Sequence, residues 1–283
     1  MTKFFAARDG RRLAYQDSGG DGPAVLCLAG LSRNHRDFED LEARLAPKRR
    51  VIRLDSRGRG FSEHAVDAHA EYNVPTEAGD AIALLDHLGL SRVALIGTSR
   101  GGILSMAIAG AQPERVSGVV LNDVGAVIEG GGLLRILATL GRPPKAQSFE
   151  AAAADLKSAN AAQFPNLPDA EWLRHAHRLY DDVEGRPTLA YDPHLRMAVS
   201  GAIEDGGPHV AIWPLFEALK TLPVLVIRGE NSDILTAETL DAMREEHSGL
   251  KTVTLKDRGH APFLNEPDAT AAIEAFLDEA DSA

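Results

Sequence analysis

A serine bracketed by glycines is the first feature of this sequence that could do chemistry. Ser99 stands at the centre of Gly97-Thr98-Ser99-Arg100-Gly101, between the apolar runs 93–96 and 103–111. Gly-x-Ser-x-Gly between a strand and a helix forms a turn so sharp that flanking side chains would collide with the neighbouring backbone. The serine hydroxyl then lies at a helix N-terminus, where backbone amides favour developing negative charge. The pattern predicts Ser99 as a nucleophile.

A serine hydroxyl needs a general base and an acid that orients the base. Candidates for both follow apolar runs late in the chain: Asp233 comes after residues 224–227, and His260 comes after residues 252–255. At the carboxyl ends of parallel strands, such side chains converge on the crevice where open α/β sheets bind ligands. We therefore expect Ser99, His260 and Asp233 to act as nucleophile, base and orienting acid.

Other residues compete for these roles. Asp123 follows residues 116–121 and is the main alternative to Asp233, whereas Asp257 is expected to cap its own loop. Among the ten histidines, five are expected on solvated helical or polar stretches: His35, His64, His69, His87 and His247. His175 and His177 stand two positions apart, and such positions do not share a face of a helix. No metal site is therefore expected.

These segments resemble the α/β-hydrolase superfamily, and the resemblance extends over nearly the whole chain. Its further segments are Leu28-Ala29-Gly30-Leu31, Asp55-Ser56-Arg57-Gly58-Arg59-Gly60-Phe61-Ser62, and Gly259-His260 followed by Asn265-Glu266-Pro267. The resemblance implies a serine esterase-like or lactonase-like member with a helical cap. In such a member Ser99 attacks, His260 takes and returns the proton, and Asp233 holds the imidazole in the required tautomer.

The resemblance also implies an oxyanion hole made of the backbone N–H groups of Leu31 and Arg100. Many members have His-Gly where this chain has Ala29-Gly30, so the hydrogen bonds that support this loop must differ here. The Arg100 side chain could meet an anionic substrate, although packing along its own helix is the simpler interpretation.

Nucleophile, base, orienting acid and oxyanion donors are the groups that acyl transfer requires. The expected reaction is therefore hydrolysis of a small carboxylic ester, lactone or thioester through an acyl-enzyme. One alternative is a carbon–carbon bond hydrolase of ring-cleavage products, although those relatives have a glycine-richer loop than residues 30–34. A ligand-sensing protein on a hydrolase scaffold is a further alternative, because such a protein can retain an intact triad.

No cofactor is expected. The segment Arg57-Gly58-Arg59-Gly60 resembles the start of a dinucleotide-binding loop. The third glycine of that fingerprint would fall at Glu63, so the pattern fails.

The elements that position these residues follow from alternating apolar runs and helical patterns, which are typical of a mostly parallel α/β sheet. We predict an α/β-hydrolase fold whose eight strands span residues 3–7, 12–17, 24–28, 51–54, 93–96, 116–121, 224–227 and 252–255. An apolar stripe from Val74 to Leu88 predicts a flanking helix that ends at Gly89. Further helices are expected over residues 236–247 and 267–278.

The alternation of apolar runs and helical patterns stops over residues 125–216, which are rich in proline and glycine. A structureless insertion of that length is uncommon inside a compact domain. We therefore expect a core domain of residues 1–124 and 217–283, and a helical cap of residues 125–216. Helices are expected over residues 149–162 and 169–182, with hinges at the glycines of 130–132 and 206–207.

The composition of the 283 residues, 44% hydrophobic and 25% charged, is that of a globular protein and excludes disordered and fibrous classes. The net charge of −11 argues against nucleic acid or an anionic membrane as partner. A small-molecule substrate is expected, and no oligomeric state is predicted. Cys27 stands in an apolar run and predicts a buried thiol. Because charges interrupt the N-terminus and no run approaches the ~18 residues of a membrane span, a soluble cytoplasmic protein is expected.

Overall fold

A central sheet positions the candidate residues. The computed structural model describes residues 1–198 and 209–282. The strands of this sheet are β1 (Lys3–Ala6), β2 (Arg12–Asp17), β3 (Ala24–Leu28), β4 (Arg50–Leu54), β5 (Val93–Thr98), β6 (Val116–Asn122), β11 (Val224–Gly229) and β12 (Lys251–Leu255). They pair in the order β1-β2-β4-β3-β5-β6-β11-β12. The pairs β1–β2 and β2–β4 are antiparallel and the others are parallel, which confirms the predicted α/β fold and its eight strands.

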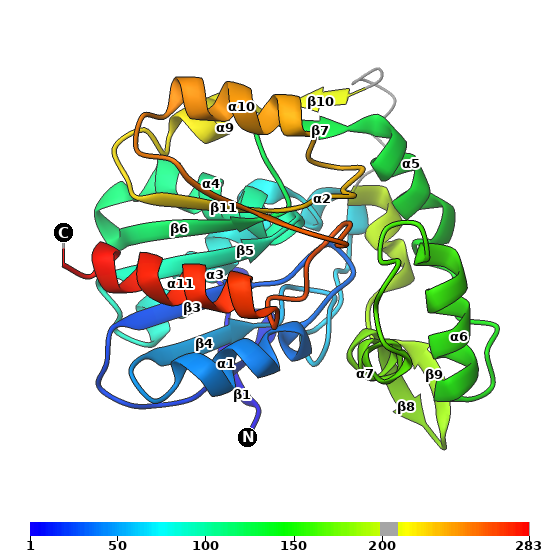
Figure 1. The fold of residues 1–283 in the computed structure, drawn as a ribbon. Coiled ribbons are helices and arrows are strands. Elements are labelled where there is room, and N and C mark those ends of the chain that lie inside the picture. Colours follow the sequence, from blue (N-terminus) through cyan, green and yellow to red (C-terminus); the bar gives the residue numbers. More distant parts are fainter. Residues whose placement is uncertain (199–208, 283) are drawn as a thin grey trace.

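Helices cover both faces of this sheet. The helices of this part of the chain are α1 (Glu39–Leu45), α2 (Ala68–Glu71), α3 (Val74–His87), α4 (Arg100–Ala111), α9 (Trp213–Glu217), α10 (Ala237–Glu246) and α11 (Pro267–Ala280). One buried cluster joins α3, α4 and α10 to the sheet, and another joins α1 and α11 to its opposite face. Figure 1 shows α4 and α10 on one side of the strands and α1 and α11 on the other. As predicted, α3 ends just before Gly89, whose φ is +64°.

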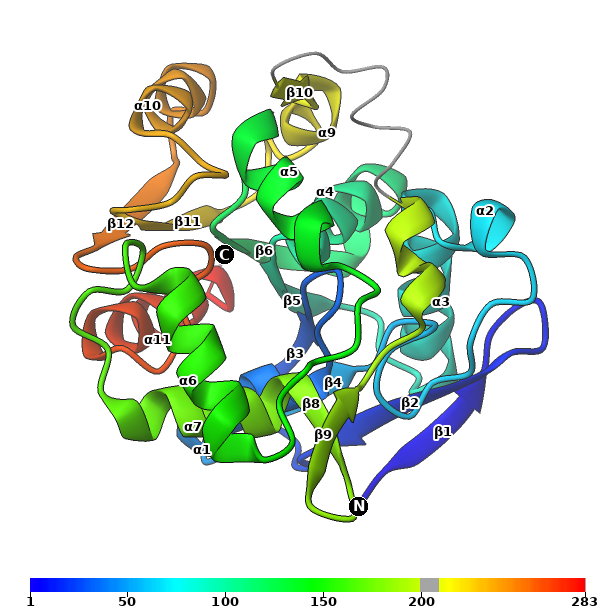
Figure 2. The same cartoon turned by 90° about the vertical axis from the view of Figure 1, so that its right-hand side faces the viewer.

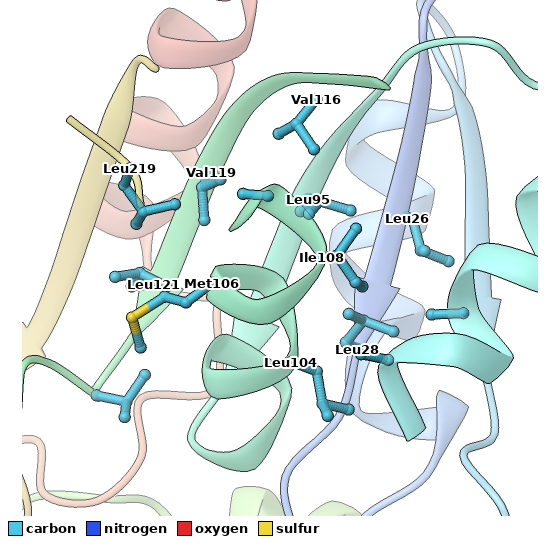
Figure 3. Close-up of a cluster of buried hydrophobic side chains, with 14 of the residues drawn as sticks. Leu26, Leu28, Leu95, Leu104, Met106, Ile108, Val116, Val119, Leu121 and Leu219 are labelled. Carbon is cyan, nitrogen blue, oxygen red and sulfur yellow. The ribbon is translucent and has the colours of Figure 1, made fainter. Parts of the chain in front are cut away.

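The helix α4 follows Ser99 and is held firmly in the core. Its side chains Leu104, Met106 and Ile108 are at most 1% exposed. Figure 3 shows them among strand residues that include Leu26, Leu28, Leu95, Val119 and Leu121. Each fully buried side chain of this size contributes about 1.5–3 kcal/mol. The N-terminus of α4, where Ser99 lies, is therefore anchored by packing.

Between β6 and β11 the chain leaves the sheet. It forms α5 (Gly130–Thr139), α6 (Phe149–Asn160), α7 (Asp169–Leu179) and two small antiparallel pairs: β7 (Val127–Glu129) with β10 (His209–Ala211), and β8 (Tyr180–Val183) with β9 (Arg186–Leu189). Short 3-10 turns occur here at Pro193–Arg196 and elsewhere at His35–Phe38 and Pro113–Arg115. Figure 2 looks onto this side and shows α5, α6 and the β8–β9 hairpin in front of the sheet.

This segment is less purely helical than expected. The helices predicted over 149–162 and 169–182 form, but the second ends at Leu179 and continues directly as the strand β8. The glycines 130–132 are the first turn of α5 and not a hinge loop. The other expected hinge, at residues 206–207, lies outside the described residues.

Two predictions about single features were tested by the fold. Cys27 on β3 is fully buried, as expected, and this burial raises the pKa of its thiol to about 12. Among the described helices, none combines the length and the apolar character needed to cross a membrane.

Candidate active site

Ser99 occupies a strained turn between β5 and α4. Its φ is +52°, a conformation that residues other than glycine rarely adopt. The chain turns so tightly that a Cβ on Gly97 would lie 2.3 Å from the carbonyl oxygen of Gly101. A Cβ on Gly101 would lie 1.9 Å from the carbonyl oxygen of Leu28. The two glycines of the Gly-x-Ser-x-Gly sequence are therefore required for steric reasons.

Ser99 lies beside the predicted histidine. The Nε2 atom of His260 is 2.9 Å from the Oγ atom of Ser99, and Nδ1 of the same ring is 2.8 Å from Oδ2 of Asp123. Asp123 directly follows β6, is fully buried and has a φ of +55°. Its Oδ1 accepts a hydrogen bond from the Gly229 N–H, and its Oδ2 accepts one from the Ser232 hydroxyl. The imidazole therefore lies between the Ser99 hydroxyl and a carboxylate that two further donors hold in place.

The expected hydrogen bond between His260 and Asp233 is absent among the described residues, because Nδ1 of His260 contacts Asp123 instead, although Asp233 lies near enough for its charge to interact with His260. Both of its oxygens accept hydrogen bonds from Arg135 of α5, at 2.6 and 2.9 Å. Burial raises the pKa of Asp233, but the hydrogen bonds and charge of Arg135, together with smaller effects of Gln163 and His260, outweigh burial and lower this pKa overall. The loop after β11 uses Ser232, one residue earlier, to reach Asp123, and this turns Asp233 toward α5. The other competitor, Asp257, accepts a hydrogen bond from Asn166 at 2.8 Å.

Sequence reasoning missed two side chains that hold this arrangement. Ser232 donates to Asp123, and Gln163, which follows α6, accepts a hydrogen bond from the His260 backbone N–H at 3.2 Å. Gln163 comes from the segment between β6 and β11. Its position relative to His260 follows from long-range packing, and no motif in the sequence marks it.

The loop after β3 brings Leu31, one of the two predicted oxyanion donors, to Ser99, whereas the other, Arg100, directly follows Ser99. Leu31 and Arg100 both line a cavity together with Ser99, and neither backbone N–H donates a hydrogen bond to another described residue. The carbonyl oxygen of Leu31 accepts a hydrogen bond from Nε of Arg59 at 2.7 Å. Arg59, which is 1% exposed, therefore supplies support to a loop that lacks the histidine many members have.

Arg59 also belongs to a buried group of charges that reaches Arg100. Glu77 of α3 lies 3.1 Å from Nη1 of Arg59 and accepts a hydrogen bond from Nη2 of Arg100 at 2.8 Å. Burial raises the pKa of Glu77, but the two guanidinium groups outweigh it and lower that pKa. The expectation that the Arg100 side chain packs along its own helix is wrong, because it pairs with α3. The carboxylate of Glu77 thus links the side chain of Arg59, which supports the Leu31 loop, to that of Arg100, which is predicted to be an oxyanion residue.

Two cavities meet at Ser99. The first, of about 170 Å³ and here called the polar cavity, is lined by Ser99, His260, Arg33, Asp37, His175 and Arg178, among others. The second, of about 230 Å³ and here called the apolar cavity, is lined by Ser99, Arg100 and mainly aliphatic residues: Val74, Ile103, Val124, Ile128, Leu133, Val210, Ile212, Leu215 and Ile234. The site can therefore hold a polar and an apolar group on different sides of the same hydroxyl.

Comparison with known proteins agrees with this fold. A sequence model of the Alpha/beta hydrolase family matches residues 25–273. The chain belongs to this family. It is therefore a hydrolase with the fold described above.

Two relatives of this hydrolase are themselves named as hydrolases. The chain is 35% identical to the 3-hydroxybutyrate-oligomer hydrolase of Cupriavidus necator over 94% of its own length and 92% of that protein's. It is 30% identical to the 2-(acetamidomethylene)succinate hydrolase of Mesorhizobium japonicum, covering 92% and 89% of the two chains. A crystal structure of an alpha/beta hydrolase from Novosphingobium aromaticivorans superposes with a TM-score of 0.91 at 40% identity, covering 98% of each chain.

Two other histidines of this hydrolase differ from expectation. His35 is buried, and its Nδ1 lies 2.9 Å from the Asp55 carboxylate. His247 is buried too, and its Nε2 lies 3.1 Å from the carbonyl oxygens of Leu219 and Leu222. Both are structural and not solvated.

In the described part of the chain, no three His, Cys, Asp or Glu side chains cluster as a metal site would require.

Proposed function

We propose that this hydrolase cleaves small carboxylic esters, lactones or thioesters through an acyl-enzyme on Ser99. The observation that carries the proposal is the unbroken contact from Ser99 through His260 to Asp123, at 2.9 and 2.8 Å. A hydroxyl, an imidazole and a buried carboxylate in this order are the groups that nucleophilic acyl transfer uses.

In this mechanism Oγ of Ser99 attacks the carbonyl carbon while Nε2 of His260 accepts its proton. Asp123 accepts a hydrogen bond from Nδ1, holds the imidazole in the tautomer whose Nε2 is free, and stabilises the imidazolium that forms. His260 then gives the proton to the leaving group, which is the oxygen of an alcohol or the sulfur of a thiol. A water molecule repeats the sequence on the acyl-enzyme and releases the acid.

The backbone N–H groups of Leu31 and Arg100 are proposed to bind the oxyanion of the tetrahedral intermediate. Both residues line the same cavity as Ser99, and both amides are without a described hydrogen-bond partner. Loss of one such donor costs about 10²–10³ in kcat in well-studied enzymes. The orientation of the Leu31 peptide therefore matters for rate.

Two further considerations support ester chemistry and a covered site. The relative at 35% identity is named for hydrolysing oligomers of 3-hydroxybutyrate, and oligomers of a hydroxy acid are joined by ester bonds. Residues 125–216 are proposed to serve as a cap, because Ile136 of α5 and Trp172, His175 and Arg178 of α7 line the polar cavity.

Labelling with a fluorophosphonate and turnover of p-nitrophenyl esters test this function together. The wild-type protein should be labelled and should hydrolyse short-chain esters. Ser99→Ala should lose the label and several decades of kcat, leaving about 10³–10⁴ over the uncatalysed rate. Ser158→Ala, which removes an exposed hydroxyl on α6, is the control and should change neither. Retention of label and turnover by Ser99→Ala would exclude the mechanism, and tight ligand binding without turnover would favour a sensor.

A further inference from the structure

The two cavities at Ser99 differ in which catalytic group they reach. His260 lines the polar cavity, whereas Arg100, one of the proposed oxyanion residues, lines the apolar one. Among the described residues, His260 does not line the apolar cavity. Ser99 and Leu31 line both. The cavities are therefore not equivalent positions for the two halves of a bound ester.

The chemistry of ester cleavage assigns a half to each cavity. The leaving oxygen must receive its proton from Nε2 of His260, so the alcohol half departs on the histidine side. That side is the polar cavity. The acyl half stays attached to Ser99 and extends into the other space, the apolar cavity, whose aliphatic walls suit a hydrocarbon chain.

The polar cavity carries an excess of positive charge among its lining side chains. Arg33 and Arg178 are two cations, and Asp37 is one anion. Asp37 accepts hydrogen bonds from Nε and Nη2 of Arg33, while Nη1 of Arg33 meets the Nε2 atom of His175 at 3.4 Å. Arg178 forms an ion pair at 2.9 Å with Asp40, and Asp40 is not among the described residues that line the cavity.

The His175 ring adds no negative charge to balance these arginines. Burial lowers its pKa well below the usual value, and the charges of Arg33 and Arg178 lower it further. The ring is therefore neutral at pH 7 and contributes no charge to the cavity. An anion in the polar cavity would meet the Nη1 side of Arg33 and the guanidinium group of Arg178, which are charge-assisted donors to a carboxylate.

We infer that the preferred substrates are esters whose alcohol half carries a carboxylate, that is, esters formed on the hydroxyl of a hydroxy acid. This inference rests on the proposed function. The carboxylate binds at Arg33 and Arg178 in the polar cavity, and an apolar acyl group lies in the apolar cavity. One water is consumed: the acyl–oxygen bond breaks, the acyl carbon gains the hydroxyl, and the hydroxy acid leaves with the proton from His260.

Three matched esters test the assignment. The first is 3-(butanoyloxy)butanoate, with the carboxylate on the alcohol half. The second is its neutral amide, 3-(butanoyloxy)butanamide. The third is monopropyl succinate, with the carboxylate on the acyl half. Wild-type kcat/KM should be about 10- to 100-fold higher for the first than for either other ester, the effect of a hydrogen bond to a charged group.

Two variants locate the preference. Arg33→Met and Arg178→Met should each bring the carboxylate-to-amide ratio of kcat/KM toward 1. Arg36→Met is the matched control, because Arg36 follows the same loop but pairs with Asp181 at 2.9 Å. Its ratio should equal that of the wild type.

The possible failures are distinguishable. A folded protein that turns over none of these esters and no p-nitrophenyl butyrate overturns the proposed function itself. Turnover of p-nitrophenyl butyrate with a carboxylate-to-amide ratio near 1 overturns the inference alone. Preference for monopropyl succinate reverses the assignment of halves, and a ratio that survives in both arginine variants excludes Arg33 and Arg178.

Discussion

Asp123 Oδ2 lies 2.8 Å from Nδ1 of His260, and the same oxygen accepts a hydrogen bond from Ser232 at 2.6 Å. The second carboxylate of this region, Asp233, accepts hydrogen bonds instead from Nε and Nη2 of Arg135. Two acids at the ends of adjacent parallel strands thus have different partners. Only the first can hold the imidazole without rearrangement.

The pair of variants Asp123→Asn and Asp233→Asn should separate these roles. Asp123→Asn should lower kcat by roughly 10⁴, because an amide at this position favours the wrong tautomer of the imidazole. Asp233→Asn should change kcat by less than about 10-fold, since it removes only a half-exposed ion pair. Steady-state kinetics on p-nitrophenyl butyrate measures both, and thermal unfolding checks that each variant is folded. A larger loss for Asp233→Asn would reassign the orienting acid.

Arg59 should act on catalysis through the Leu31 carbonyl. Arg59→Met removes the 2.7 Å hydrogen bond to this oxygen, so the Leu31 N–H should lose its fixed direction. We expect kcat to fall by about 10- to 100-fold with little change in KM, as for a misplaced oxyanion donor. Arg59→Lys should recover part of the loss.

The control for Arg59 is Arg100→Met, which breaks the other ion pair with Glu77 but leaves the Leu31 carbonyl bonded. If the two methionine variants lose kcat equally, Arg59 acts through the buried charges and not through the oxyanion loop.

Glu77→Gln should destabilise the fold more than either arginine variant. Glu77 is fully buried and is the carboxylate that Arg59 and Arg100 share. Without it, two buried guanidinium groups have no counter-charge, and breaking a buried pair in this way costs about 3–5 kcal/mol. Denaturant unfolding measures the change. Asp86→Asn on the same helix is the control, because its pair with Arg115 is exposed and should contribute no more than about 1 kcal/mol.

Glu71 should make stability depend on acid pH. Burial raises the pKa of Glu71, but hydrogen bonds from Arg11 and from the N–H groups of Asp67 and Val66 together outweigh burial and lower this pKa from 4.5 to about 2. A carboxylate with a depressed pKa stabilises the fold above its unfolded pKa and loses that contribution as pH falls through its folded pKa. The Tm difference between wild type and Glu71→Gln should therefore be full above pH 5 and shrink between about pH 4.5 and 2. A difference that is constant over this range would contradict the assignment.

The local sequence determines the strands of the sheet and the turn that carries Ser99. The apolar runs predict the strands because they are buried on both faces of a parallel sheet. The turn at Ser99 is also determined by a short stretch of sequence. The tight turn requires glycine at positions 97 and 101, because a Cβ at either position would overlap the backbone. Ser99 and His260 lie beyond the carboxyl ends of β5 and β12, at the same edge of the sheet, and this follows from the order of the elements although β6 and β11 separate the two strands.

The tertiary structure alone decides which acid meets His260. Asp123 and Asp233 both follow strands, and their strands β6 and β11 are neighbours in the sheet. The choice depends on the direction that each loop takes after its strand, and this direction is set by distant groups. Ser232 and Gly229 hold Asp123, while Arg135, 98 residues before Asp233, draws Asp233 away. The tertiary structure also decides the hydrogen bond from Arg59 to the Leu31 carbonyl and the ion pair of Arg100 with Glu77. Contacts between residues far apart in the chain leave no local sequence pattern from which they could be predicted.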